Sequence, residues 1–215
     1  MLSLSYQDLD DFTGLAAVRE AVARGDPGLL VHDLPPLVRD LPLKDIPLGY
    51  KAKKADNAKP AAVIVMQALH VFSHSVFKNL SHVAELPWER YFGEIHEFSA
   101  PGKDELRIVS HDQPVANQWS TLTIVLNTSH PEQAIVHFGT ALSVFTEGMT
   151  PEPTGSSIDL AELSGSSAKP PGGWLVYYVR PNDDVFYTRT AGALMAPLSM
   201  ADYKDRKKVQ DLNIV

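Results

Sequence analysis

Hydrophobic residues recur every three to four positions in two stretches of this chain. In residues 11–24 they fall on one helical face, and Gly25 follows where the C-terminus of a helix favours glycine. A longer series runs from Pro60 to about Glu85, and proline is well suited to the first turn of a helix. The spacing predicts an N-terminal helix and a long core helix.

Other stretches have the pattern of strands. Residues 106–109 are mostly apolar, and residues 119–126 alternate large apolar side chains with threonine, which predicts a strand with one buried face. Residues 174–180 and 185–190 are rich in valine, tyrosine and phenylalanine. The four residues between them are Pro-Asn-Asp-Asp, which favour a tight turn. We therefore expect a C-terminal hairpin.

The apolar residues of segment 134–145 fit two patterns. Alternate positions are apolar, as in a strand, but Ile135, Phe138 and Leu142 also lie on one helical stripe. The preceding Ser-His-Pro-Glu resembles a helix-capping sequence, and Gly148 stands where a helix would end. These ends favour a helix over a strand.

Five prolines interrupt residues 27–50, with aliphatic residues between them. Proline stops helices and removes a backbone donor, so this segment is predicted to be an extended arm with one short helical turn near residues 37–40. The aliphatic residues need a surface to cover. The arm either packs across its own domain or reaches onto a neighbouring subunit.

Together these elements predict an α+β fold, with amphipathic helices packed on a small, mainly antiparallel sheet and an extended proline-rich N-terminal arm. Residues 1–59 would hold the first helix, the arm and a basic segment. Residues 60–215 would form the core. Within the core, residues 150–173 are expected to form a flexible loop, because more than half of them are proline, glycine or serine.

Composition excludes several classes of function. The 19 lysines and arginines against 26 aspartates and glutamates give a net charge of −7, which does not favour binding of nucleic acid over the whole surface. The chain has no cysteine, so disulfides, thiolate nucleophiles and cysteine-ligated metals are excluded. Glycine-rich phosphate-binding motifs and the G-x-S-x-G motif are absent too. No cofactor is expected.

One pair of histidines has a spacing with chemical meaning. His70 and His74 are four residues apart on the long helix, so one metal ion could bridge them. A third ligand would be needed, and Glu94, His96 and Glu97 are the nearest in sequence. The spacing differs from H-E-x-x-H, and no glutamate lies inside the pair. Histidines at the boundary of the core, bonded to water or a carbonyl, would give the same pattern.

The lysines of residues 51–59 form the main basic segment: Lys51, Lys53, Lys54 and Lys59. Such a segment attracts an anionic partner, a lipid surface or a nucleic acid, in a salt-dependent way. No aromatic residue is interleaved with these lysines, so stacking on bases is not indicated. A solvated linker is the simpler interpretation.

The N-terminus lacks the features of a signal peptide, and the most apolar stretch is interrupted by histidines, so a cytoplasmic protein without a transmembrane segment is expected. With no convincing catalytic motif, the sequence favours a non-enzymatic structural or assembly protein that forms a homo-oligomer. A viral or phage coat or matrix component would have this build, which makes the virion a second location. The alternative is a metal-dependent enzyme using His70 and His74.

Overall fold

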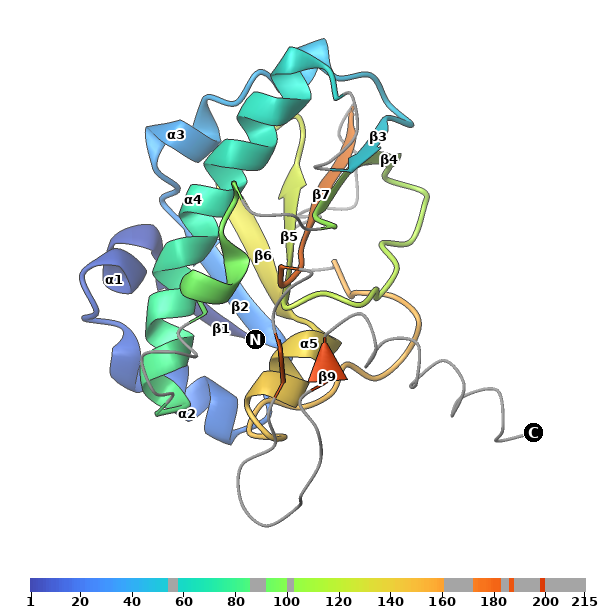
Figure 1. Cartoon of the computed structure of the whole chain (residues 1–215). Helices are drawn as coiled ribbons and strands as arrows, with labels where there is room; N and C mark the ends of the chain where they lie inside the picture. Colours follow the sequence, from blue (N-terminus) through green and yellow to red (C-terminus); the bar gives the residue numbers. More distant parts are fainter. Residues whose placement is uncertain are drawn as a thin grey trace.

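The structure is a computed structural model that describes residues 1–53, 58–85, 92–99, 103–160 and 172–182, together with the backbone of residues 186–187 and 198–199. Its centre is a seven-stranded sheet in the order β1-β2-β6-β5-β7-β4-β3 (Figure 1). The strands are β1 (Leu2–Ser5), β2 (Gly28–His32), β3 (Lys51–Lys53), β4 (Glu105–Ser110), β5 (Leu122–Asn127), β6 (Gln133–Phe138) and β7 (Gly173–Val179). Only β1 and β2 are parallel, so the sheet is mixed.

Four of the five described helices lie on one side of this sheet, and the short helix that follows β6 lies at its end (Figure 1). The helices are α1 (Tyr6–Asp10), α2 (Leu15–Ala23), α3 (Pro36–Arg39), α4 (Pro60–Val83) and α5 (Thr140–Phe145), with short 3-10 turns η1 (Leu43–Asp45) and η3 (Glu94–His96). The first three helices all contact α4. A two-stranded sheet of β8 (Phe186–Tyr187) and β9 (Leu198–Ser199) completes the described elements.

Side chains of alternate residues pack on opposite faces of the sheet, because successive residues of a strand point to opposite sides. On the helical face, Leu175, Tyr177 and Val179 of β7 join α4 in the main hydrophobic core. On the other face, Trp174, Val176 and Tyr178 pack with Val115 and Ile158 from connecting segments in a second, smaller core. The two cores bury both faces of β5, β6 and β7.

Helix α4 confirms the prediction of a long core helix from Pro60. Among the described residues it is the one helix long and apolar enough to cross a membrane, yet 61% of its most apolar window is buried in the protein. Its apolar stripe packs in the main core, through residues such as Val65, Leu69 and Phe72. The helix is therefore a core element of this fold.

The predicted α+β class is confirmed, but the sheet is larger than expected and takes in part of the proline-rich segment. Residues Gly28–His32 form the buried strand β2 between β1 and β6, where an extended arm was predicted. The helical turn was predicted correctly near α3, and the aliphatic Leu34 and Val38 lie in the protein's own core. Leu34 and Val38 of the proline-rich segment are thus buried by other residues of the same chain.

Three other predictions need correction. Segment 134–145 is a strand followed by a helix, β6 and α5, with Gly139 between them. The helix predicted over residues 11–24 begins at Leu15, because Phe12 has a left-handed backbone (φ 66°) that separates α1 from α2. The predicted C-terminal hairpin is wrong, since β7 pairs with β4 and β5, and β8 pairs with β9.

Of the loop predicted at 150–173, residues 150–160 contain no helix and only one isolated bridge, at Ser157. Residues 161–171 lie outside the described part of the chain, as do residues 203–208.

Candidate functional site

Two carboxylates that are adjacent in sequence at the start of β4 lie on opposite faces of the sheet. Asp104 lies on the helical face, where it accepts a hydrogen bond of 2.7 Å from the Tyr177 hydroxyl. Its other oxygen accepts one of 2.7 Å from the backbone N–H of Arg180. Glu105, the next residue, contacts the cations of the opposite face. Asp104 and Glu105 are almost fully buried. Because a buried charge without hydrogen bonds or an ion pair is costly, these contacts are required for both carboxylates to stay in the interior.

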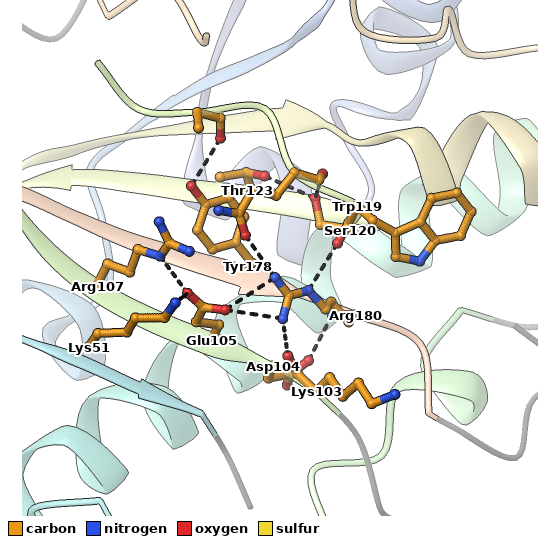
Figure 2. A network of polar contacts seen from close by, with 12 residues as sticks. Lys51, Lys103, Asp104, Glu105, Arg107, Trp119, Ser120, Thr123, Tyr178 and Arg180 are labelled. Atoms are coloured by element: carbon orange, nitrogen blue, oxygen red, sulfur yellow. Dashed lines mark hydrogen bonds and ion pairs between the residues drawn. The ribbon is translucent and has the colours of Figure 1, made fainter. Parts of the chain in front are cut away.

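Glu105 is the centre of a cationic network formed with Lys51, Arg107 and Arg180 (Figure 2). One carboxylate oxygen, Oε1, accepts from Arg107 Nε and lies 3.3 Å from Lys51 Nζ. The other, Oε2, lies 3.4 Å from both terminal nitrogens of Arg180. Three cations from three strands or strand ends therefore share one buried carboxylate.

Arg180 is bonded at all three of its nitrogens. Nε donates to the carbonyl of Trp119 at 2.9 Å, and Nη2 donates to Gln118 Oε1 at 2.9 Å (Figure 2). Nη1 donates to the carbonyl of Lys103. These bonds fix the guanidinium between the segment before β4 and the segment before β5, which gives Arg180 a structural role in holding the network.

The register of the sheet explains why these residues meet. Lys51 of β3 lies opposite Arg107 of β4, and Glu105 lies opposite Tyr178 of β7. The Tyr178 ring lies between the two guanidinium groups, 5.5 Å from Arg107 and 5.6 Å from Arg180. Its hydroxyl donates to the carbonyl of Ala116. The aromatic face thus adds a favourable surface for both cations.

Electrostatics keep Glu105 ionised. Burial by itself raises the pKa of its carboxyl, but the hydrogen bond from Arg107 and the charges of Arg107 and Arg180 outweigh it, so that the pKa is lowered. On the other face, burial and the charge of Asp104 raise the pKa of Tyr177 well above its usual range, which keeps its hydroxyl protonated as a donor.

The structure brings together the histidines predicted from the sequence. The Nε2 atoms of His70 and His74 are 3.2 Å apart, and their rings meet edge to face at 4.9 Å. His70 Nδ1 lies 4.0 Å from Asp104 Oδ2, so the pair adjoins the carboxylate of the helical face. Burial, together with the charge of Lys78, lowers the pKa of His74. A neutral imidazole is the form that binds metals.

The three candidate third ligands are not gathered at this pair. His96 contacts the Phe92 carbonyl through Nδ1 and the Thr121 hydroxyl through Nε2, both at 2.6 Å. The charge of the exposed Glu94 only partly offsets the lowering of the His74 pKa by burial and by Lys78, so Glu94 acts on the pair electrostatically. Over the described residues, no group of three or more histidines, aspartates and glutamates could hold a metal ion.

The four lysines proposed for an anionic partner have different surroundings. Lys51 belongs to the cationic network, and Lys53 is exposed two residues further along β3. Lys59 places its ammonium 5.7 Å from the centre of the Tyr50 ring. Lys54 lies outside the described residues. Of the four lysines, the structure thus places only Lys51 in a defined charged site among the described residues.

Sequence reasoning missed Glu105, Arg107 and Arg180. A signal was present, because Glu105 and Arg107 occupy alternate positions of a segment whose other members, Leu106 and Ile108, are buried in the main core. Charged residues at alternating positions of a strand usually indicate a solvated face. Here Glu105 is buried on that face, and it is paired with Lys51, Arg107 and Arg180.

Comparisons with known proteins identify the fold. No family model and no curated protein matches the sequence. The structure is similar to that of a full-length Neurospora crassa protein in complex with alpha-KG, with 9% identity, a TM-score of 0.64 and coverage of 96% of this chain and 95% of that one. It is also similar to a protein from Shewanella oneidensis described as an oxygenase (12% identity, TM-score 0.60, 100% of both chains).

A third similar structure is a protein from Caulobacter crescentus assigned to the 2OG-Fe(II) oxygenase family, with 12% identity, a TM-score of 0.61 and coverage of 98% of both chains. At these identities the similarity shows the fold. The prediction of a non-enzymatic structural or assembly protein is nevertheless wrong, because two of these similar structures, matched over nearly the whole chain, are described as oxygenases and not as coat or matrix proteins.

Proposed function

We propose that this chain is a metal-dependent enzyme built on the fold of 2OG-Fe(II) oxygenases, with alpha-KG as the co-substrate to test first. The observation that carries the proposal is the structural similarity over 96–100% of the chain to three proteins, two of them described as oxygenases and the other solved in complex with alpha-KG. A match of this extent includes the central sheet and the helices packed on it. It is therefore more than the similarity of a single recurrent motif.

His70 and His74 are the candidate metal ligands. Two ligands of one metal ion, each bonded at about 2.0–2.1 Å, lie roughly 3.0–3.4 Å apart, and the two Nε2 atoms are 3.2 Å apart. Metal-bound histidines commonly have a carboxylate near the second ring nitrogen, and Asp104 lies 4.0 Å from Nδ1 of His70. Tyr177 and the Arg180 backbone hold that carboxylate in place.

The described residues do not complete an iron site. Non-haem iron oxygenases use two histidines and one carboxylate. All eight histidines lie in the described residues, and no third ligand joins His70 and His74 there. No catalytic step is therefore assigned to a metal.

Metal titration tests the proposal directly. Purified protein would be freed of metal with a chelator and titrated anaerobically with Fe(II), and alpha-KG consumption would then be measured. We expect one equivalent of metal for the wild type, and loss of binding in His70→Ala and His74→Ala. His130→Ala, at an exposed position, is the matched control and should bind normally. A wild type that binds no metal would overturn the proposal.

A further inference from the structure

The two edges of the seven-stranded sheet differ in chemistry. The strand order places β1 at one edge and β3 at the other. On β3 the exposed side chains are Lys51 and Lys53, and lysines on an edge strand discourage other strands from pairing with it. The sequence of β1 is Leu-Ser-Leu-Ser. It contains neither a charged residue nor a proline, so its own sequence does not protect β1 from pairing.

The outer side of β1 presents the backbone of Ser3. Along a strand, the N–H and C=O groups of successive residues point alternately to its two sides. The N–H of Ser5 donates to Asp8 Oδ2 at 3.2 Å and therefore points away from β2, the parallel neighbour of β1. The N–H and C=O of Ser3, two residues earlier, point to the same outer side. Ser3 is exposed, and within the described residues no group bonds to it on that side.

The side chains of β1 make this edge complementary to a second copy of itself. Leu4 lies in the main core on the helical face, and Leu2 packs against that core. Ser3 lies between them and points to the other face. When two β1 strands run antiparallel with Ser3 opposite the partner's Ser3, Leu2 of each copy lies opposite Leu4 of the other. Opposite residues share a face, so the leucines of both copies remain on the helical face.

We propose that β1 is the pairing edge of a homodimer, in which the β1 strands of two copies lie antiparallel and join their sheets into one. A two-fold axis passes between the two Ser3 residues, which exchange two backbone hydrogen bonds, and each copy contributes the same surface. The edge favours a second copy over an unrelated peptide, because this register matches apolar and polar positions in both copies. It lies at the opposite end of the sheet from β3, so the dimer does not involve the cationic network.

Sedimentation velocity of the full chain over the micromolar range tests the dimer. A pairing strand of four residues makes a smaller interface than the roughly 1,600 Å² of a standard complex, so we expect a monomer–dimer equilibrium in this range. Ser3→Pro removes the outward N–H in both copies, and proline is tolerated on an edge strand where that N–H faces solvent. It should weaken dimerisation at least about tenfold, because two backbone hydrogen bonds are lost. Ser3→Ala keeps the backbone and should dimerise as the wild type does.

A second variant keeps the test decisive if Ser3→Pro disturbs the fold. Ser3→Lys keeps the backbone N–H but brings two ammonium groups together at the two-fold axis, and should also give a monomer. Val71→Lys changes an exposed apolar side chain of α4 and should leave the dimer intact. A wild type that stays monomeric over this range, an unchanged dimer in Ser3→Lys, or loss of the dimer in Val71→Lys would each overturn the pairing through β1.

Discussion

The two faces of the sheet stabilise neighbouring carboxylates with different partners. On the helical face, Asp104 is held by neutral donors, the Tyr177 hydroxyl and the Arg180 backbone N–H, and adjoins the histidine pair of α4. On the other face, Glu105 is surrounded by three cations. The alternation of a strand is enough to separate a hydrogen-bonded carboxylate from an ion-paired one at adjacent positions.

The difference matters for what each face can bind. The helical face offers imidazoles at ligand spacing but no described third ligand, so its chemistry depends on a metal and on a further residue. The cationic face is ordered by its own charges, because Glu105 is shared by Lys51, Arg107 and Arg180. The two faces therefore differ in chemistry within one sheet.

The largest effect is expected from Glu105→Gln. The substitution leaves three cations around a neutral side chain, two of them partly buried, and breaking a buried ion pair on one side costs about 3–5 kcal/mol. Urea unfolding at pH 7 measures this loss. Glu20→Gln is the control, because Glu20 pairs with Arg24 on the exposed surface of α2, where solvent screening leaves an ion pair little effect on stability. Similar losses in both variants would contradict the central role of Glu105.

A smaller, pH-dependent effect is expected from His137 on β6, whose position lies opposite Thr123 on the cationic face. Burial lowers the pKa of His137 to about 4, and its Nδ1 has no partner among the described residues. An unfolded histidine takes up its proton near pH 6.5, so between about 6.5 and 4 the unfolded state binds more protons. The free energy of unfolding should therefore fall as the pH is lowered, by about 3 kcal/mol in total.

Comparing the wild type with His137→Gln isolates this contribution from that of the carboxylates. Urea unfolding at pH 7 and pH 4.5 should show a smaller loss of stability in the variant, because glutamine does not titrate. The exposed His130→Gln should keep the wild-type pH dependence. Identical pH dependence in the wild type and His137→Gln would show that this histidine titrates normally in the folded protein.

The sequence predicted those elements whose signal is local. Helix α4 has an uninterrupted 3.6-residue pattern, and it also brings His70 and His74 together as their spacing predicted. Strand β2 was missed because Pro27 and Pro35 were taken to interrupt the whole segment, although both lie outside Gly28–His32. Residues 134–145 carried both periodicities because a strand and a helix meet there, separated by Gly139.

The cationic network could not be predicted from local patterns. Lys51, Glu105 and Arg180 come from three segments that are distant in sequence, and only the order β7-β4-β3 places them side by side. That order is set by tertiary pairing, which hydrophobic alternation does not encode. The expected homo-oligomer, the cytoplasmic location and any lipid or nucleic-acid partner of the basic segment stay predictions.

The smallest expected difference in the free energy of unfolding is between variants of Tyr177 and Tyr178, adjacent residues of β7 that lie on opposite faces of the sheet. Tyr177→Phe removes a donor to the charged Asp104, and such bonds contribute about 1.5–3 kcal/mol. Tyr178→Phe removes a donor to the neutral carbonyl of Ala116, worth about 0.5–1.5 kcal/mol, and keeps the ring between the guanidinium groups. Urea unfolding of both variants should rank Tyr177→Phe as the more destabilised. The reverse order would mean that the Tyr178 hydroxyl, and not the Asp104 carboxylate, anchors β7.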